Sequence, residues 1–204
     1  MTAPIRLLLA DDQALVRGAL AALLGLEPDL EVVAEVARGD EVLAAVQAQP
    51  VDVALLDIEM PGLDGIAVVG ELRRHAPTVR ALIVTTFGRP GFLRRALDAG
   101  AAGFVVKDTP AAELADAVRR VHAGLRVVDP ELATESLLEG MNPLSRREQD
   151  VLAGALTGAP VAEIARSLSL SAGTVRNYLS TAAAKTGARS SFEAAVTARD
   201  RGWL

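Results

Sequence analysis

Residues 53–57 have the sequence Val-Ala-Leu-Leu-Asp, in which four apolar residues, enough for a buried β-strand, end directly at an aspartate. The N-terminal part of the chain repeats this design, because the apolar run Ile5–Ala10 is followed by Asp11 and Asp12. Short runs that are apolar throughout are typical of strands buried on both faces of a parallel sheet. The two stretches therefore favour an α/β fold with acidic residues at the ends of its strands.

Five apolar runs of strand length alternate with segments of helical periodicity through residue 123. The expected strands are Ile5–Ala10, Val32–Val36, Val53–Leu56, Ala81–Thr85 and Gly103–Val106. The expected helices are Ala14–Leu24, Asp40–Gln49, Ile66–His75, Phe92–Ala99 and Ala112–Ala123. Such a series predicts a doubly wound, five-stranded parallel sheet, and ligands of these sheets bind beyond the carboxyl ends of the strands.

The alternation stops after residue 124, and the remaining residues predict a linker followed by a helical domain. Residues 125–142 contain one short apolar stretch with helical spacing, Leu132–Leu138. The later helices are expected at Arg146–Leu156, Val161–Leu168, Ala172–Lys185 and Phe192–Arg201. We therefore expect an α/β domain at 1–124, a linker at 125–142 and an all-α domain at 143–204.

Composition limits the classes of protein to which the chain can belong. The chain has no cysteine, which excludes disulfides and thiol catalysis. It has neither a signal-peptide pattern at its start nor an apolar run long enough for a membrane helix, so we expect a cytoplasmic protein without a membrane partner. The net charge of −5 is uneven, because residues 144–204 carry 8 Lys/Arg against 5 Asp/Glu. A small basic domain hints at polyanion binding.

Polar residues follow four of the predicted strands. Asp11 and Asp12 follow the first strand and Asp57 the third, while Thr85 ends the fourth and Lys107 follows the fifth. Three acids at one sheet edge favour a hard divalent cation such as Mg²⁺, and the hydroxyl and the ammonium add a donor and a positive charge. Each residue alone has a simpler explanation, for example as a helix cap. Together they are the parts needed to accept a phosphoryl group.

The second domain contains a pattern typical of a helix-turn-helix. A short amphipathic segment, Val161–Leu168, is followed by a turn and by Ser171, a good N-cap for the next helix. We expect Arg176 and Asn177 to contact bases. The other candidate DNA contacts are Ser171, Thr174, Ser180, Thr181, Lys185 and Arg189. The pattern alone leaves open a small helical bundle whose polar face is only solvated.

Four segments of the first domain resemble the signature segments of response-regulator receiver domains, over about residues 3–124. They are Leu8–Asp12, Asp57–Gly65, Thr85–Phe87 and Lys107–Asp108. The resemblance implies that Asp57 is the phosphoacceptor. It also implies that Asp12 and Asp57 bind Mg²⁺, helped by Asp11 directly or through water and by the backbone carbonyl of Glu59.

The same resemblance assigns the switch residues. Thr85 would contact the phosphoryl oxygens on activation, and Lys107 would pair with the phosphoryl charge. Phe104 stands where many receivers have a tyrosine that swings inward, so its ring can switch but cannot make the hydrogen bond of a hydroxyl.

The second domain resembles the LuxR-type DNA-binding domain. The matching segments are Leu144–Glu148, Glu163–Ala165 and Ser171–Tyr178. The whole chain thus resembles the NarL/FixJ class of two-component response regulators, and within it the DesR-like branch. This resemblance implies a sensor histidine kinase as phosphodonor, double-stranded DNA as a partner and regulation of transcription.

We expect phosphorylation to control a homodimer, because the modification adds a charge of about −1.5 to −2 beside Thr85 and Lys107. Our hypothesis places one dimer face on the first and fifth helices, and a second on the last helix in the DNA-bound form. The first face would contain Leu15, Val16, Leu114, Val118 and Val121, and the second Phe192, Ala195 and Val196.

Two other functions use the same residues. A small Mg²⁺-dependent aspartyl-phosphate enzyme would share the acids, but it needs a substrate pocket or cap that these short loops do not supply. A phosphorylation-independent DNA-binding regulator would keep the fold without the switch, and the intact acidic set argues against it.

Overall fold

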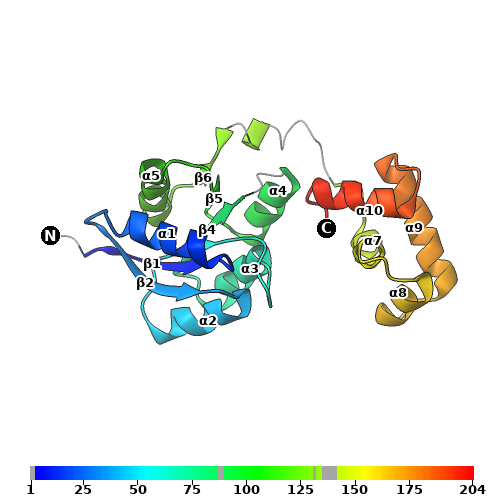
Figure 1. The fold of residues 1–204 in the computed structure, drawn as a ribbon, viewed down its shortest axis with the longest axis horizontal. Helices are drawn as coiled ribbons and strands as arrows, with labels where there is room; N and C mark the ends of the chain where they lie inside the picture. The colour runs from blue at the N-terminus through cyan, green and yellow to red at the C-terminus, as the bar shows by residue number, and fades with distance from the viewer. Residues whose placement is uncertain (1–2, 87–89, 131, 135–141) are drawn as a thin grey trace. The chain divides into compact units, whose positions relative to one another are not determined.

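A computed structural model describes residues 3–86, 90–130, 132–134 and 142–204. The chain divides into two compact units (Figure 1). Of the described residues, 3–86, 93–130 and 132–134 belong to the first unit, and 90–92 and 142–204 belong to the second. Within the described ranges, no helix is long and apolar enough to cross a membrane.

The first unit is built on a parallel sheet with the strand order β2-β1-β3-β4-β5-β6. The strands are β1 (Ile5–Ala10), β2 (Leu30–Val36), β3 (Val53–Leu56), β4 (Arg80–Thr85), β5 (Gly103–Val106) and β6 (Val127–Val128). The residues of β3 are all buried, as expected for a strand covered on both faces. The direction of winding reverses between β1 and β3, so this is where a ligand site is expected.

The prediction of five strands was wrong in number. Val127 and Val128, which we assigned to the linker, pair in parallel with Gly103 and Phe104 of β5. The Val127 amide donates to the carbonyl of Ala102 at 3.1 Å. A run of two valines is too short to give a strand pattern, which is why the sequence did not indicate it. Of the predicted linker helix Leu132–Leu138, residues 132–134 are helical, and the rest lies outside the described residues.

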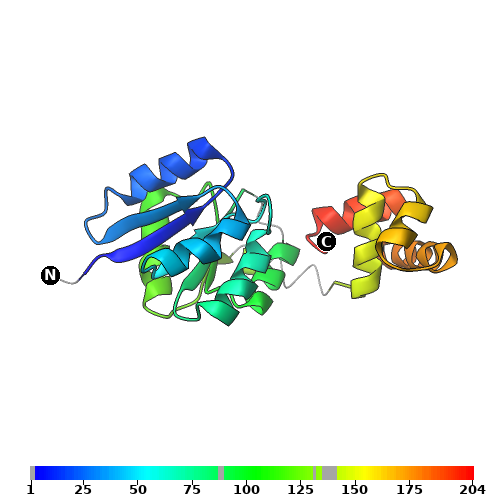
Figure 2. The same cartoon turned by 90° about the horizontal axis from the view of Figure 1, so that it is seen from below.

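Helices cover both faces of this sheet (Figures 1 and 2). Helix α1 (Ala14–Leu24) contacts α5 (Ala111–His122) on one face, and α2 (Gly39–Ala48) contacts α3 (Gly65–His75) on the other. Helix α4 (Pro90–Ala99) connects β4 to β5. Helix α3 begins at its N-cap Asp64, whose carboxylate accepts from the Ala67 amide at 2.7 Å, and basic residues in its last turn suit the negative end of the helix dipole.

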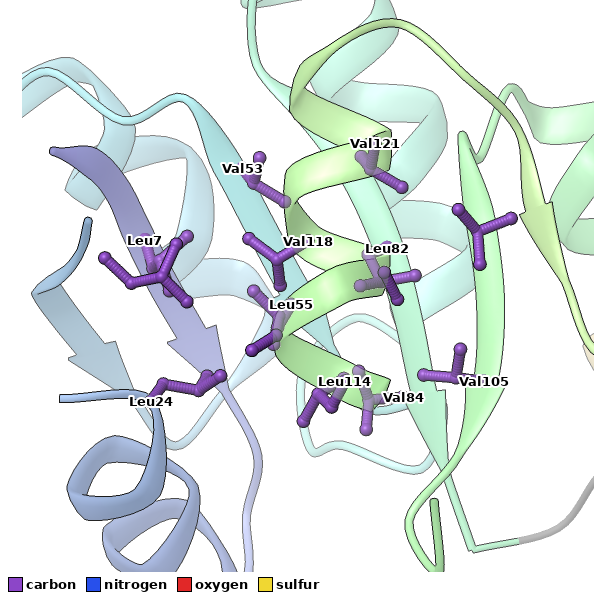
Figure 3. Packing of buried hydrophobic residues seen from close by; sticks show 14 of the residues in the cluster. Leu7, Leu24, Val53, Leu55, Leu82, Val84, Val105, Leu114, Val118 and Val121 are labelled. Carbon is purple, nitrogen blue, oxygen red and sulfur yellow. The ribbon is translucent and has the colours of Figure 1, made fainter. Parts of the chain in front are cut away.

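The core between the sheet and α1/α5 corrects our dimer hypothesis. Figure 3 shows Leu114, Val118 and Val121 on the face of α5 that is turned towards the strands, beside Leu55 and Leu82. All three α5 side chains are buried in this cluster. They stabilise the unit itself and are not available to a second copy, so this part of the predicted dimer face was wrong. The helical periodicity was correct, but it marked the core side of α5.

Within residues 142–204, the second unit contains the helices α7 (Arg146–Leu156), α8 (Val161–Ser167), α9 (Ala172–Thr186) and α10 (Ser191–Asp200). Its core is formed mainly by small and aliphatic side chains, among them Val151, Leu152, Val175 and Leu179, and by Trp203. Helices α7, α9 and α10 each begin at a serine whose side chain accepts a hydrogen bond from a first-turn amide. Of the three, Ser171 was predicted as a cap from the sequence, and Ser145 and Ser190 begin α7 and α10 in the same way.

Candidate functional site

The ends of β1 and β3 bring the three predicted acids together. The Asp57 amide donates to the carbonyl of Ala10 at 2.9 Å, which aligns the end of β3 with the end of β1. Asp11, Asp12 and Asp57 each place a carboxylate oxygen within 4.8 Å of the others. Asp11 and Asp57 are buried, whereas Asp12 is exposed and opens the cluster to solvent.

The donor set of this cluster fits Mg²⁺. Three carboxylates supply hard oxygen ligands, and the exposed side of Asp12 leaves room for the waters that Mg²⁺ retains. Glu59, whose carbonyl was predicted as a further ligand, lies two residues after Asp57 in an exposed loop. Its role as a ligand stays a prediction.

Lys107 joins the cluster as predicted from its position after β5. Its ammonium lies 2.7 Å from Asp11 Oδ2 and 2.9 Å from Asp57 Oδ2. Burial by itself would lower the pKa of Lys107, but the hydrogen bonds to Asp11 and Asp57 outweigh it and raise that pKa. Lys107 therefore stays charged and compensates part of the repulsion between the acids.

Burial has the opposite consequence for Asp57. Desolvation raises the pKa of its carboxyl, and the negative charge of Asp11 adds to this, while Lys107 and the Ile58 amide act against it. The Ile58 amide donates to Asp57 Oδ1 at 2.8 Å, so both carboxylate oxygens are oriented. A cation bound beside the carboxylate would favour its ionised, nucleophilic form.

The two predicted switch residues lie on neighbouring strands. Thr85 is buried at the end of β4, and its carbonyl accepts from the Lys107 amide at 2.8 Å. Phe104 is fully buried on β5, opposite Ile83. The hydrogen bond from the Lys107 amide thus joins the end of β5, the strand of Phe104, to Thr85 at the end of β4.

Two residues with a structural influence on the site had no assigned role. Gly65 packs on the backbone of Asp57, where a Cβ would lie 2.0 Å from the Asp57 carbonyl oxygen, so no other residue fits without moving this loop. Arg17 donates to the carbonyl of Asp11 at 2.6 Å. The signal for Arg17 was present in the sequence, because it is the one charged residue of the otherwise apolar stretch Ala14–Leu24.

In the second unit, α9 has the geometry of an exposed second helix of a helix-turn-helix. Its buried side is formed by Val175, Leu179 and Ala182. The predicted DNA contacts Arg176, Asn177, Ser180 and Thr181 are exposed and recur at the spacing of one helical face. Ser171 and Arg189 are also exposed, and Thr174 is half-buried with its hydroxyl 2.8 Å from that of Ser171.

Lys185 has a partner within its own unit. Its ammonium donates to Glu148 Oε2 at 2.8 Å, and Glu148 is a buried residue in the first turn of α7. Its role as a phosphate contact stays a prediction, but the last turn of α9 is fixed to α7 through this pair.

The remaining residues of the dimer hypothesis differ in exposure. Leu15 is 87% exposed and Val16 is half-buried on α1. On α10, Phe192 is 58% exposed and Val196 half-buried. Ala195 is buried in the core of its own unit, so it was wrongly included in a dimer face.

Comparison with known proteins identifies both units. Residues 7–119 match the response regulator receiver domain, and residues 142–198 match the luxR family of bacterial regulatory proteins. The chain belongs to the LuxR-type response regulators. It is 42% identical over 200 residues to the uncharacterized transcriptional regulatory protein YvfU of Bacillus subtilis (strain 168), with 98% of this chain and 100% of that protein aligned. It is 41% identical over 200 residues to the transcriptional regulatory protein DesR of the same organism, covering 98% and 99%.

A solved structure is also similar to this response regulator over the whole of both chains. The response regulator ChrA, of a heme-sensing two component system, has a TM-score of 0.60 and 32% identity, and the match covers 100% of both chains. The receiver and LuxR-type domains predicted from the sequence are thereby confirmed, as is the relation to DesR-like proteins. The family consists of transcription regulators of two-component systems.

Proposed function

We propose that Asp57 accepts a phosphoryl group from a partner histidine kinase, and that this modification switches dimerisation and sequence-specific DNA binding. The observation that carries the proposal is the oriented, buried Asp57 carboxylate, 2.9 Å from the Lys107 ammonium and within 4.8 Å of two further acids. In the reaction, a carboxylate oxygen forms the new O–P bond while the N–P bond of the donor breaks.

The residues of the acidic cluster have separate tasks in this proposal. Asp11, Asp12 and Asp57, with the carbonyl of Glu59, hold Mg²⁺, which supplies charge neutralisation for the transferred group when bound. Lys107 leaves its ion pair with Asp57 and pairs with the phosphoryl oxygens, and the Thr85 hydroxyl donates to them. The ring of Phe104 moves with Thr85, because the two strands are neighbours.

On DNA, α9 enters the major groove with its exposed face towards the bases. Arg176 and Asn177 contact base edges, because arginine suits guanine and asparagine suits adenine. The contacts to phosphates come from Ser171, Thr174, Ser180, Thr181, Lys185 and Arg189. The DNA-binding domain then occupies residues 143–204, and the receiver occupies residues 1–124 together with β6.

The dimer face of the receiver is reduced to the exposed side of α1, with Leu15 and Val16, and Phe192 and Val196 pair on α10 when DNA is bound. We place the protein in the cytoplasm, where kinase and DNA are both accessible. We expect no catalytic turnover, because the acidic cluster needs only to hold one acyl phosphate in each chain.

Intact-mass measurement tests the phosphoacceptor. Incubation of the wild-type protein with acetyl phosphate and Mg²⁺ should add one phosphoryl mass, and Asp57→Asn should add none. Asp116→Asn is the matched control, since this acid on α5 is 62% exposed and takes no part in the cluster. It should be modified like the wild type.

DNA binding tests the switch with the same proteins. Phosphorylated wild type should bind an operator fragment, selected from random DNA, more tightly than Asp57→Asn does. Equal binding by the two would instead favour a phosphorylation-independent regulator. Release of many phosphates per chain from a phosphate ester would favour the aspartyl-phosphate enzyme.

A further inference from the structure

Arg17 contacts the backbone of the acidic cluster from helix α1. Its guanidinium Nη1 donates to the carbonyl oxygen of Asp11 at 2.6 Å, and its Nε lies 3.5 Å from Glu35 Oε2 at the end of β2. The Arg17 side chain is largely buried, with 19% of its surface exposed. A long, charged side chain is therefore held in one conformation, against its large rotamer entropy, to reach a single backbone carbonyl.

The carbonyl that Arg17 contacts belongs to the peptide group joining Asp11 to Asp12. The backbone of Asp11 is fixed on its other side by the bond from its amide to the carbonyl of Val36 at 3.2 Å. The Asp11 carboxylate is fixed as well, by the Gln13 amide at 2.9 Å and by Lys107. Asp12 is exposed and makes no such hydrogen bond or ion pair with the residues that the structure describes, so its position depends on the peptide group before it.

We propose that Arg17 is a positioning residue for cation binding, because its guanidinium fixes the Asp11–Asp12 peptide group and thereby the direction in which Asp12 offers its carboxylate. The inference rests on the proposed function, since it concerns the Mg²⁺ site of that reaction. The Glu35 carboxylate balances the positive charge of Arg17, which would otherwise repel a cation near the cluster.

Arginine is suited to this task because its planar guanidinium can donate to the carbonyl through one nitrogen while another nitrogen faces the Glu35 carboxylate. A lysine has the charge but presents its donors from a single point, so it cannot maintain both contacts in the same geometry. Groups that orient ligands in this way, without touching the metal, commonly change metal affinity by about 10–100-fold when removed.

A titration with Mg²⁺ alone tests the proposal on the full chain, without any phosphodonor. Binding is followed through the amide resonances of residues 11–13, in wild type, Arg17→Gln, Arg17→Lys and Glu35→Gln. We expect Arg17→Gln to weaken Mg²⁺ binding about tenfold or more, and Arg17→Lys to lie between it and the wild type. We also expect the metal-free Asp12 amide resonance to shift in Arg17→Gln, and Glu35→Gln to weaken binding less than Arg17→Gln.

Arg6→Gln is the matched control for lost stability. Arg6 also bonds an acid from a partly buried position, but its partner Asp52 precedes β3, at the opposite end of that strand from Asp57. Arg6→Gln should lower the melting temperature and leave the Mg²⁺ dissociation constant unchanged. The proposal is overturned if Arg17→Gln is folded and binds Mg²⁺ like the wild type. It is also overturned if Arg17→Gln does not fold while Arg17→Lys binds as the wild type does.

Phosphorylation by acetyl phosphate on the same samples separates this inference from the proposed function. A wild type that binds Mg²⁺ but is not phosphorylated would contradict the proposed function and leave the Arg17 result standing. A wild type that is phosphorylated, with an Arg17→Gln variant of equal Mg²⁺ affinity, would contradict only the role of Arg17. For Arg17→Gln we expect the phosphorylation rate at saturating Mg²⁺ to equal that of the wild type. We expect the Mg²⁺ concentration that gives half of this rate to be higher than in the wild type.

Discussion

At the scale of single residues, Glu148 has two tasks in the DNA-binding domain. It is the third residue of α7 and forms a capping box, in which its carboxylate accepts from the Ser145 amide at 2.6 Å. The same oxygen accepts from Lys185 at the last turn of α9 at 2.8 Å. A single buried carboxylate therefore joins the start of one helix to the end of the helix that we expect to contact DNA.

Glu148→Gln should separate these two tasks, because glutamine keeps the capping box but removes the charge that Lys185 needs. We expect the free energy of unfolding at neutral pH to fall by roughly 1–2 kcal/mol, a value reduced by the partial exposure of Lys185. Urea denaturation measures it. Asp150→Asn is the control, since its pair with Arg147 is exposed and 3.8 Å long, and it should change stability by only a few tenths of a kcal/mol.

The stabilisation by Glu148 should depend on pH in one direction. Burial raises the pKa of its carboxyl, but the bonds from Lys185 and from Ser145 outweigh this, and the pKa in the folded protein lies below the usual glutamate value. The stabilisation is therefore complete above the unfolded pKa of about 4.3 and is lost as the pH falls through the folded pKa. The difference between wild type and Glu148→Gln should shrink below that pH, and a constant difference would contradict the assignment.

At the scale of elements, β6 depends on a glycine in the neighbouring strand. A Cβ at Gly103 would lie 2.7 Å from Leu82 Cδ1 and 2.9 Å from the carbonyl oxygen of Val127. Only glycine at this position therefore allows β6 to lie this close to β5. It also leaves space for the Val121 side chain of α5, whose Cγ2 would lie 3.2 Å from the added Cβ. Because β5 also carries Phe104, β6 pairs with the strand of a predicted switch residue.

Gly103→Ala should destabilise the receiver by about 1–3 kcal/mol through overpacking, and the amide of Val127 should lose protection from hydrogen exchange. Gly70→Ala on α3 is the opposite control, because nothing lies within 4 Å of its added Cβ. That substitution should stabilise the helix by about 0.5–1 kcal/mol. Equal effects of the two substitutions would mean that the close approach of β6 is unimportant.

The elements also show what the sequence could predict and what it could not. Short apolar runs and helical periodicity located β1 to β5 and the helices to within about two residues, and Ser171 marked the start of α9, because periodicity and capping are local properties. The meeting of Asp11, Asp57 and Lys107 followed from their strand ends. In contrast, β6, the buried side of α5 and the Arg17 contact depend on tertiary packing. Periodicity on α5 could identify an apolar face, but not whether the sheet or a second copy covers it.

At the scale of the whole molecule, the proposed function requires that a signal at Asp57 reach α9 in the other unit. Dimerisation would provide a route that does not require a direct contact between the two units. Two linked domains bind paired DNA sites more tightly than one, because the second contact becomes intramolecular. A symmetric dimer also sets two copies of α9 at the spacing of paired half-sites, about 34 Å.

The dimer face on α1 can be tested without damage to the fold, because Leu15 is 87% exposed. With Mg²⁺ and beryllofluoride as a phosphoryl mimic, light scattering should give the mass of a dimer for wild type, and Leu15→Arg should remain a monomer. Asp57→Asn should remain a monomer both with and without beryllofluoride. Val118→Arg cannot serve here, since a charge at this fully buried position would unfold the receiver. A dimer of Leu15→Arg with beryllofluoride would exclude α1, and the exposed Phe192 on α10 would be the next position to substitute.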